Sequence, residues 1–158
     1  MNVVMDIQKF SLGNTYFLET KRNIIMEGTF TKIIYSNHNF SFNGIFLFFP
    51  IEITSIEKIM NKYIMKLNPT SEINSPILHD FSRLELKLIE YYKQMTNCSK
   101  RATCLFSKQL YSGHIKIYKG LDEHINKDKQ YIIKLSGIWE TYDEVGITYK
   151  IIECSSFI

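Results

Sequence analysis

The chain has 158 residues, which is enough for one domain to bury a core without disulfides or metal ions. Hydrophobic residues make up 45% and charged residues 22%, and this balance excludes an intrinsically disordered chain. The longest apolar run, residues 45–49, is far too short to cross a bilayer, and the first ten residues lack the layout of a signal peptide. We therefore expect a single domain over residues 1–158 that is cytoplasmic, in a reducing compartment, with no membrane partner.

Charge distribution and residue usage narrow the class of protein further. The formal net charge is only +3, but residues 100–134 hold eight Lys or Arg against three acids, a local net charge of +5. The chain has 24 Ile and 16 Lys but one Ala, a bias typical of an AT-rich viral, phage or plasmid genome. Cys98, Cys104 and Cys154 show no metal-ligand spacing with each other or with histidines, so we expect reduced thiols and no metal or other cofactor.

The first half of the chain reads as strands followed by a helix. Aromatic and β-branched residues dominate residues 15–19 and 23–35, with a candidate turn at residues 21–23, and predict two antiparallel strands. After a polar turn at residues 36–39, a third strand is predicted over residues 40–49. Gly28 and Gly44 fall within these predicted strands, where a glycine is typical of a bulge or a sharp bend.

Two helices are predicted next. Thr54 and Glu57 match a capping box, which predicts a helix that continues to about Leu67. A second helix begins at Asn74 or at Asp80. Its apolar stripe, typical of a helix that packs on a core, is Phe81, Leu84, Leu88, Tyr91 and Met95.

The C-terminal part of the chain returns to strands. Residues 101–106 and 111–118 are predicted strands, and two longer runs, 131–139 and 145–152, flank a polar turn and predict a β-hairpin. Strict alternation along the first run gives it a large apolar face, which we expect to enter the core. That face consists of Tyr131, Ile133, Leu135, Gly137 and Trp139, whereas Lys134 and Lys150 fall on the opposite, mixed face.

This order of elements predicts the fold class. We expect a fold that is mostly β with two helices, arranged as a five-stranded OB-type Greek-key barrel with a helical insertion between strands 3 and 4. A two-layer α+β sandwich would produce the same order, and this alternative stays open.

The sequence shows no constellation typical of an enzyme. It contains no phosphate-binding glycine loop, no HExxH, no GxSxG and no paired-cysteine metal motif. His114 beside Lys116, and residues 122–124, come closest to a catalytic site, but neither has a neighbouring nucleophile or base. We therefore expect a protein that is not an enzyme and has no catalytic residues.

With no enzyme expected, the notable feature of the predicted strands is that they are rich in basic and aromatic residues. In proteins that bind single-stranded nucleic acids, aromatic rings stack on the bases and basic side chains contact the phosphates. Trp139 is ambiguous, because it could lie in a binding groove, but Leu135 and Ile133 on the same face favour a core position. The predicted nucleic-acid-binding residues are Lys100, Arg101, Lys108, Tyr111, Lys116, Tyr118, Lys119, Tyr131, Lys134, Trp139, Tyr149 and Lys150.

The hairpin also carries a family resemblance. Residues 131–140 followed by residues 146–150 contain a KxSxxW-like strand, a short polar turn and a G-[IV]-[ST]-x-[KR] strand. This pattern resembles the closing hairpin of OB-fold single-stranded DNA-binding proteins of phages, large DNA viruses and cytoplasmic linear plasmids. The resemblance implies a sequence-tolerant binder that coats intermediates of DNA replication and recombination, with Lys134 and Lys150 on the binding side and Trp139 near it.

Three functional hypotheses follow. The first is a single-stranded DNA-binding protein that acts in replication or recombination of an AT-rich viral or plasmid genome, at a viral replication site or in the cytoplasm. The second is a non-catalytic structural or interaction subunit of a virion or replication complex. The third has RNA as the ligand, because base stacking alone does not distinguish RNA from DNA. Self-association and a replication-protein partner stay open in each case.

Overall fold

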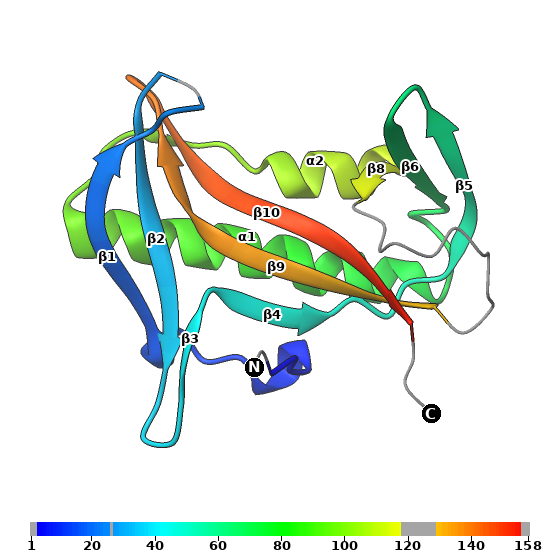
Figure 1. The fold of residues 1–158 in the computed structure, drawn as a ribbon, viewed down its shortest axis with the longest axis horizontal. Helices are drawn as coiled ribbons and strands as arrows, with labels where there is room; N and C mark the ends of the chain where they lie inside the picture. The colour runs from blue at the N-terminus through cyan, green and yellow to red at the C-terminus, as the bar shows by residue number, and fades with distance from the viewer. Residues whose placement is uncertain (1–2, 26, 118–128, 156–158) are drawn as a thin grey trace.

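The structure is a computed structural model that describes residues 3–25, 27–117 and 129–155 (Figure 1). Over this part of the chain the fold is mostly β with two helices, and the main sheet is curled into a half-barrel. The long helix α1 (Asn74–Thr96) covers one face of this sheet, and the short helix α2 (Leu105–Ser112) packs beside one edge. Two 3-10 turns, Ile7–Lys9 and Leu12–Asn14, precede the first strand.

Seven strands form the main sheet within the described residues, in the order β1-β2-β9-β10-β7, with β3 paired to β2 and β4 paired to β9. Their bounds are β1 Thr15–Arg22, β2 Thr29–Ser36, β3 Ser41–Asn43, β4 Ile45–Phe48, β7 Arg101–Ala102, β9 Lys129–Glu140 and β10 Glu144–Ser155. The predicted β-hairpin is confirmed as β9 and β10. The predicted turn at residues 21–23 is wrong, because β1 continues to Arg22 and the loop follows it.

A β-bulge in β9 changes which of its side chains face the core. A register shift against β10 leaves Ser136 as an extra residue between Leu135 and Gly137. Alternation up to Leu135 is as predicted, but beyond the bulge Ile138 joins the core cluster and Trp139 turns to the opposite face. The predicted placement of Gly137 and Trp139 on the core-facing side is therefore wrong. The expected burial of Trp139 is nevertheless confirmed, because this residue is only 7% exposed.

Gly44 forms the bend that separates β3 from β4. Its φ of +104° lies in the left-handed region that favours glycine, and a Cβ there would lie 2.9 Å from the carbonyl oxygen of Leu135. Before the bend β3 pairs with β2, and after it β4 pairs with residues 132–135 of β9. The predicted strand over residues 40–49 is thus two short strands, and the predicted bend at Gly44 is confirmed.

The helix α1 supplies much of the core. It begins at Asn74, which is one of the two predicted starts, and ends at Asn97 in a left-handed conformation. Tyr92, rather than the predicted Tyr91, is fully buried, and Met95 is 63% exposed. The residues that α1 buries are Asn74, Leu78, Phe81, Leu84, Glu85, Leu88, Ile89 and Tyr92. No helix in the described part of the chain combines the length and hydrophobicity needed to cross a membrane.

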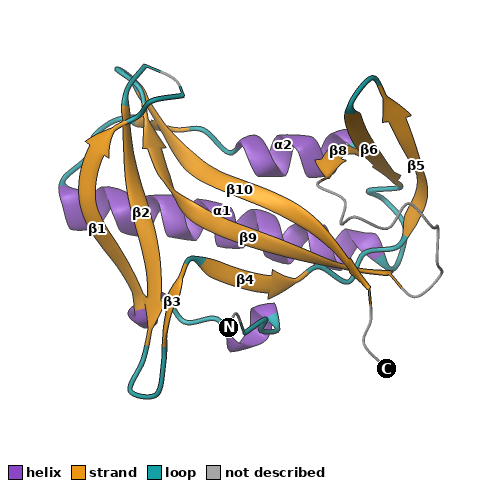
Figure 2. Cartoon of the chain, viewed as in Figure 1, coloured by secondary structure: helices purple, strands orange, loops and turns teal. Residues whose placement is uncertain are grey.

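Residues 53–67 form strands and not the predicted helix. They make the hairpin β5 (Ile53–Ile59) and β6 (Lys62–Leu67), and β8 (His114–Ile117) completes a three-stranded antiparallel sheet, at the right of Figure 2. Met65 and Leu67 of β6 are buried, and Met65 pairs with the buried Ile115 of β8. This period-2 burial outweighs the local capping-box motif, which is weak because Thr and Ile also favour strands.

Two further predicted strands are shorter than expected because α2 lies between them. The buried carboxylate of Glu85 in α1 accepts hydrogen bonds from the backbone N–H groups of Phe106 and Ser107, each at 2.9 Å. These contacts cap the N-terminus of α2, so the predicted strand at residues 101–106 is reduced to β7. Gly113, with φ of +76°, ends α2. Of the predicted strand at residues 111–118, residues 114–117 form β8, and residue 118 lies outside the described residues.

Candidate nucleic-acid interface

The strand registers align side chains of the main sheet in rows that cross β2 or β4, then β9, then β10. Residues paired in register point to the same side of a sheet, so each row belongs to one face. Three rows face α1 and are mostly buried, and together they define the inner face. They are Thr31–Ile138–Ile147, Ile45–Leu135–Tyr149 and Leu47–Ile133–Ile151.

Four alternate rows point away from α1 and define the outer face, which is turned to the viewer in Figure 1. The only charged residues in these rows are Lys32, Lys134 and Lys150. Among the other members are four large aromatic residues, so positive charge and aromatic rings share one surface. The rows are Phe30–Trp139–Gly146, Lys32–Gly137–Thr148, Phe46–Lys134–Lys150 and Phe48–Ile132–Ile152.

Two aromatic rings of the outer face lie against glycines of the neighbouring strand. A Cβ on Gly137 would lie 2.4 Å from the ring of Phe30, and a Cβ on Gly146 would lie 2.4 Å from the ring of Trp139. Only glycine leaves room for rings in these positions. Phe30 remains half-buried, whereas Trp139 is too covered to offer a free ring face for stacking.

The most accessible aromatic residue in the four rows is Phe48, whose side chain is 41% exposed. In the adjacent row the Lys134 Nζ lies 5.4 Å from the centroid of the Phe46 ring, a cation–π contact, and Phe46 is largely buried. The outer face therefore offers Phe48 and part of Phe30 for stacking, and three lysines for contacts with phosphates.

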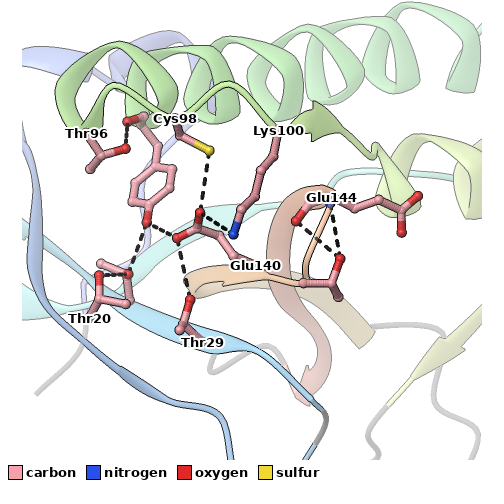
Figure 3. A network of polar contacts seen from close by, with 10 residues as sticks. Thr20, Thr29, Thr96, Cys98, Lys100, Glu140 and Glu144 are labelled. Atoms are coloured by element: carbon pink, nitrogen blue, oxygen red, sulfur yellow. Dashed lines mark hydrogen bonds and ion pairs between the residues drawn. The ribbon is translucent and has the colours of Figure 1, made fainter.

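Glu140, the one acidic residue of β9, and Glu153 of β10 lie on the inner face. Glu140 ends β9 and points toward α1, where its carboxylate accepts a hydrogen bond from the Tyr92 hydroxyl at 2.6 Å (Figure 3). The Glu153 carboxylate lies 2.5 Å from the Lys129 ammonium, and both side chains are largely buried. These two acids therefore do not reduce the positive charge of the outer face.

Glu140 is the centre of the polar network in Figure 3. Besides Tyr92, its carboxylate contacts Lys100 Nζ at 3.3 Å, Cys98 Sγ at 3.4 Å and Thr29 Oγ1 at 3.5 Å. Burial alone would raise the pKa of Glu140, but the hydrogen bonds from Tyr92, Cys98 and Lys100 outweigh burial and hold this pKa below its ordinary value. The network joins the hairpin to the end of α1, so we interpret it as structural.

Several predicted binding residues are placed where they contact protein rather than ligand. Lys100 is paired with Glu140, and Arg101 is paired with Glu144, so both cations are partly neutralised. Tyr131 and Tyr149 lie on the inner face. Burial raises the pKa of Tyr131 to about 12, with a further contribution from Glu153, and burial also raises the pKa of Tyr149.

The remaining predicted residues are divided among three places. Lys134, Lys150 and Trp139 belong to the outer face, as the rows show. Lys108 and Tyr111 are exposed on α2, and Lys116 is exposed on β8 of the small sheet. Tyr118 and Lys119 lie outside the described residues. The structure therefore does not gather the predicted set onto one surface.

Lys32 and Phe48 are members of the outer face that the sequence interpretation does not select. Lys32 lies on the same side of β2 as Phe30, which alternation within residues 29–36 could have indicated. Phe48 follows Gly44, whose bend makes it pair with β9. Only the folded structure shows that Lys32 and Phe48 lie on the same face of the sheet as Lys134.

The described residues contain no group of three or more His, Cys, Asp or Glu that could hold a metal ion, and the three cysteines are free thiols. The chain matches no protein-family model, no curated protein and no solved structure. A functional proposal therefore depends on the geometry of the outer face.

Proposed function

We propose that the outer face of the main sheet binds single-stranded DNA without sequence preference, and that the protein is a non-enzymatic binder that acts in DNA replication or recombination. The observation that supports this is the composition of the four outward rows, in which every charged residue is a lysine and the accessible aromatic residues are Phe48 and, in part, Phe30. Such a surface suits a single strand, because its bases can stack on rings while its phosphates meet cations.

The expected strength of binding follows from the same residues. Three phosphate contacts, from Lys32, Lys134 and Lys150, give a slope of about −2 for the logarithm of the binding constant against the logarithm of salt concentration. Each stacked base adds roughly 1–3 kcal/mol, and Phe48 is the ring best exposed for it. Binding is thus modest per molecule and sensitive to salt.

The finer description of the fold as an OB-type barrel belongs to this proposal. The curled half-barrel and the β9–β10 hairpin support it, since OB-fold binders use one face of a curved sheet for oligonucleotides. The position of a helical insertion between the third and fourth barrel strands remains a prediction from the order of elements along the chain.

A second candidate function is a structural or interaction subunit, and one row favours it. Phe48, Ile132 and Ile152 form an apolar strip across three strands, and none of the three is fully buried. An apolar strip of this kind can pack against another protein. Binding through it would depend little on salt, whereas binding to phosphates weakens steeply as salt rises.

The deciding experiment is fluorescence anisotropy of a labelled oligo-dT, titrated with the purified protein at 50 and 200 mM salt. Duplex DNA and an RNA oligomer of the same length serve as competitors. The proposal predicts binding that weakens with salt and prefers the single DNA strand over the duplex. Binding that does not change with salt, or no binding at the lower salt concentration, would contradict it and favour the interaction subunit. Equal competition by RNA would change the ligand to single-stranded nucleic acid in general.

A further inference from the structure

The first strand of the main sheet, β1, extends the outer face beyond the four rows described above. In this strand Tyr16 pairs with Ile34 of β2, its neighbour in the sheet (Figure 1). The next residue, Phe17, packs its ring against Tyr92 of α1 with a centroid distance of 5.0 Å, so Phe17 lies on the inner face. Because successive side chains of a strand alternate between faces, Tyr16 points to the outer face.

With β1 included, Tyr16 is the most exposed aromatic residue of the outer face. It is 54% exposed, compared with 41% for Phe48. Its side chain forms no hydrogen bond and no aromatic contact with the residues that the structure describes. Such a ring offers a free surface on which a base can stack, and its hydroxyl can stay in water.

The row that begins at Tyr16 leads to the lysines of β9 and β10. Ile34 pairs with the exposed Asn43 at the end of β3, and the bend at Gly44 follows. A Cβ on Gly44 would lie 3.4 Å from Cε of Lys134, so the end of β3 lies beside this lysine. Lys134 in turn pairs with a lysine of β10. One outward path therefore crosses five strands, in the order Tyr16, Ile34, Asn43, Lys134 and Lys150.

The length of this path sets a minimum size for the ligand. Neighbouring strands lie about 4.8 Å apart, so a path across five strands is about 20 Å long. A single strand of about four nucleotides covers it, which is the lower end of the site sizes of single OB-type domains. A dinucleotide would reach only one end of the path.

The charges that β1 adds to the outer face cancel. A β-bulge leaves both Leu18 and Glu19 opposite Lys32, and the exposed Lys21 pairs with Phe30. One acid and one base therefore border this part of the face. We expect β1 to contribute a stacking ring and an apolar neighbour, Leu18, but no net attraction for phosphates.

We propose that Tyr16 is a base-stacking residue of the outer face, and that the ligand is a single DNA strand of about four or more nucleotides that crosses from β10 to β1. This inference rests on the proposed function, because it extends the same face. Phosphates meet Lys134 and Lys150 at one end of the path, and a base at the other end stacks on Tyr16.

The path suits a single strand better than a duplex. The bases of a duplex are stacked on one another, so they cannot stack on a ring at a protein surface. The sheet is also curled, and a single strand can follow the curve, whereas a duplex is stiff over lengths of up to about 150 base pairs.

Anisotropy titration of oligo-dT with Tyr16→Ala tests the proposal. We expect binding to weaken roughly fivefold or more, with an unchanged salt slope, because a stacking contact releases no counterions. Tyr16→Phe keeps the ring and should bind like the parent chain. The matched control is Tyr111→Ala, because Tyr111 is 52% exposed on α2, beside β10 and away from β1, and its loss should leave the affinity unchanged. Far-UV circular dichroism checks that each variant is folded.

The same titrations separate failure of this inference from failure of the proposed function. If the parent chain does not bind oligo-dT, both are wrong. If the parent chain binds, and Lys134→Ala weakens binding while Tyr16→Ala does not, DNA binds the outer face without reaching β1, and only this inference is overturned. Equal loss in Tyr111→Ala and Tyr16→Ala, or in Tyr16→Phe and Tyr16→Ala, would also contradict stacking on Tyr16.

Photo-crosslinking locates the contact directly. Oligo-dT strands that each carry one 5-iodouracil, at a different position in each strand, are irradiated in complex with the full-length protein, and mass spectrometry identifies the linked residue. We expect Tyr16 to be linked from positions near one end of the strand and not from positions near the other end. The absence of a link to Tyr16 from every position, or equal links from all positions, would overturn the proposed path.

Unlabelled oligo-dT competitors of increasing length test the size of the ligand. Affinity for the parent chain should rise steeply up to about four nucleotides and more slowly beyond that length. Tyr16→Ala should lose most of this rise, because a longer strand gains no ring at β1. The same dependence on length in both chains would contradict a path that ends at Tyr16.

Discussion

The Tyr92 hydroxyl lies 2.6 Å from the Glu140 carboxylate, and this contact joins the long helix α1 to the end of strand β9. Tyr92 is fully buried, and its hydroxyl also lies 3.3 Å from Thr31 Oγ1 on β2. Burial, first of all, and the hydrogen bond to Glu140 raise the pKa of Tyr92. One phenol therefore connects the helix to two neighbouring strands of the sheet.

Glu140→Gln should lower the free energy of unfolding at pH 7 by roughly 1–3 kcal/mol, because a charged acceptor of several hydrogen bonds is lost. Urea denaturation measures this change. Tyr92→Phe removes one of the same hydrogen bonds and should cost less, about 1 kcal/mol. If Glu140→Gln were as stable as the parent chain, the free-energy cost of removing the carboxylate from water would cancel the stabilisation from its hydrogen bonds, and the prediction would be wrong.

The same carboxylate predicts a dependence of stability on pH. The pKa of Glu140 is lowered in the folded state, so its contribution is complete above the ordinary value of 4.5 and is lost as pH falls through the lower folded pKa. The parent chain should therefore lose more stability than Glu140→Gln between pH 5 and pH 3. Denaturation midpoints at several pH values would show this, and parallel curves for the two chains would contradict it.

Glu85→Gln should destabilise the protein by roughly 2–3 kcal/mol. Both carboxylate oxygens accept hydrogen bonds from the start of α2, and the amide of glutamine would turn one acceptor into a donor that faces N–H groups. The matched control is Glu90→Gln, whose exposed side chain on the same helix forms a surface ion pair with Lys93 at 3.7 Å. It should change stability by less than about 0.5 kcal/mol. Urea denaturation of both variants would show whether stability is lost because buried hydrogen bonds of Glu85 are lost or because any negative charge on α1 is removed.

Gly146→Ala should cost roughly 1–3 kcal/mol, because the new methyl group would overlap the ring of Trp139 and approach the Thr103 carbonyl oxygen to 2.8 Å. The ring has to move, so the emission maximum of Trp139 should shift toward that of a more exposed indole. Gly13→Ala is the matched control, since its nearest neighbour would be the Ser11 hydroxyl at 3.6 Å. An unchanged emission spectrum in Gly146→Ala would contradict the placement of the ring.

Lys134→Ala and Lys150→Ala should each weaken binding of oligo-dT and reduce the magnitude of the salt slope by about 0.7. Phe48→Ala should weaken binding by roughly 1–3 kcal/mol without changing that slope, because a stacking contact involves no counterion. Lys87→Ala on α1 lies on the other side of the sheet and serves as the control in the same anisotropy titrations. Loss of affinity in Lys87→Ala equal to that in Lys134→Ala would contradict the outer face as the interface.

The sequence predicts the β9–β10 hairpin and α1 correctly because each is long and has one dominant period. It fails at residues 53–67, where a capping-box match spans four residues but the burial of Met65 is decided by Ile115, fifty positions away. The bulge at Ser136 also could not be predicted from the sequence, because a serine within a strand does not indicate a shift in strand register. Patterns of neighbouring residues cannot predict contacts between residues this far apart in the sequence.

For the candidate site, alternation along the hairpin correctly places Lys134 and Lys150 on one face, because their pairing needs only neighbouring strands. The predicted binding set also includes Tyr131 and Tyr149, chosen by residue type, and the structure places these two on the inner face. Selecting Tyr131 and Tyr149 assumed that a hydroxyl indicates a wet surface, whereas Tyr131 is buried in the core and Tyr149 packs against the core, partly buried. Lys32 joins the face only through the contact between β2 and β9, which no spacing along the chain reveals.

The position of β9 has a consequence for the order in which the chain can fold during synthesis. β9 is the only strand of the described sheet that touches β2, β4 and β10, yet it lies more than eighty positions after β4 in the sequence. A nascent chain that ends before residue 129 contains the N-terminal strands and both helices. It lacks β9, the strand that joins β2 and β4 in one sheet. Such a chain exposes the edges of β2 and β4, and it folds into the native sheet only when the C-terminal hairpin leaves the ribosome.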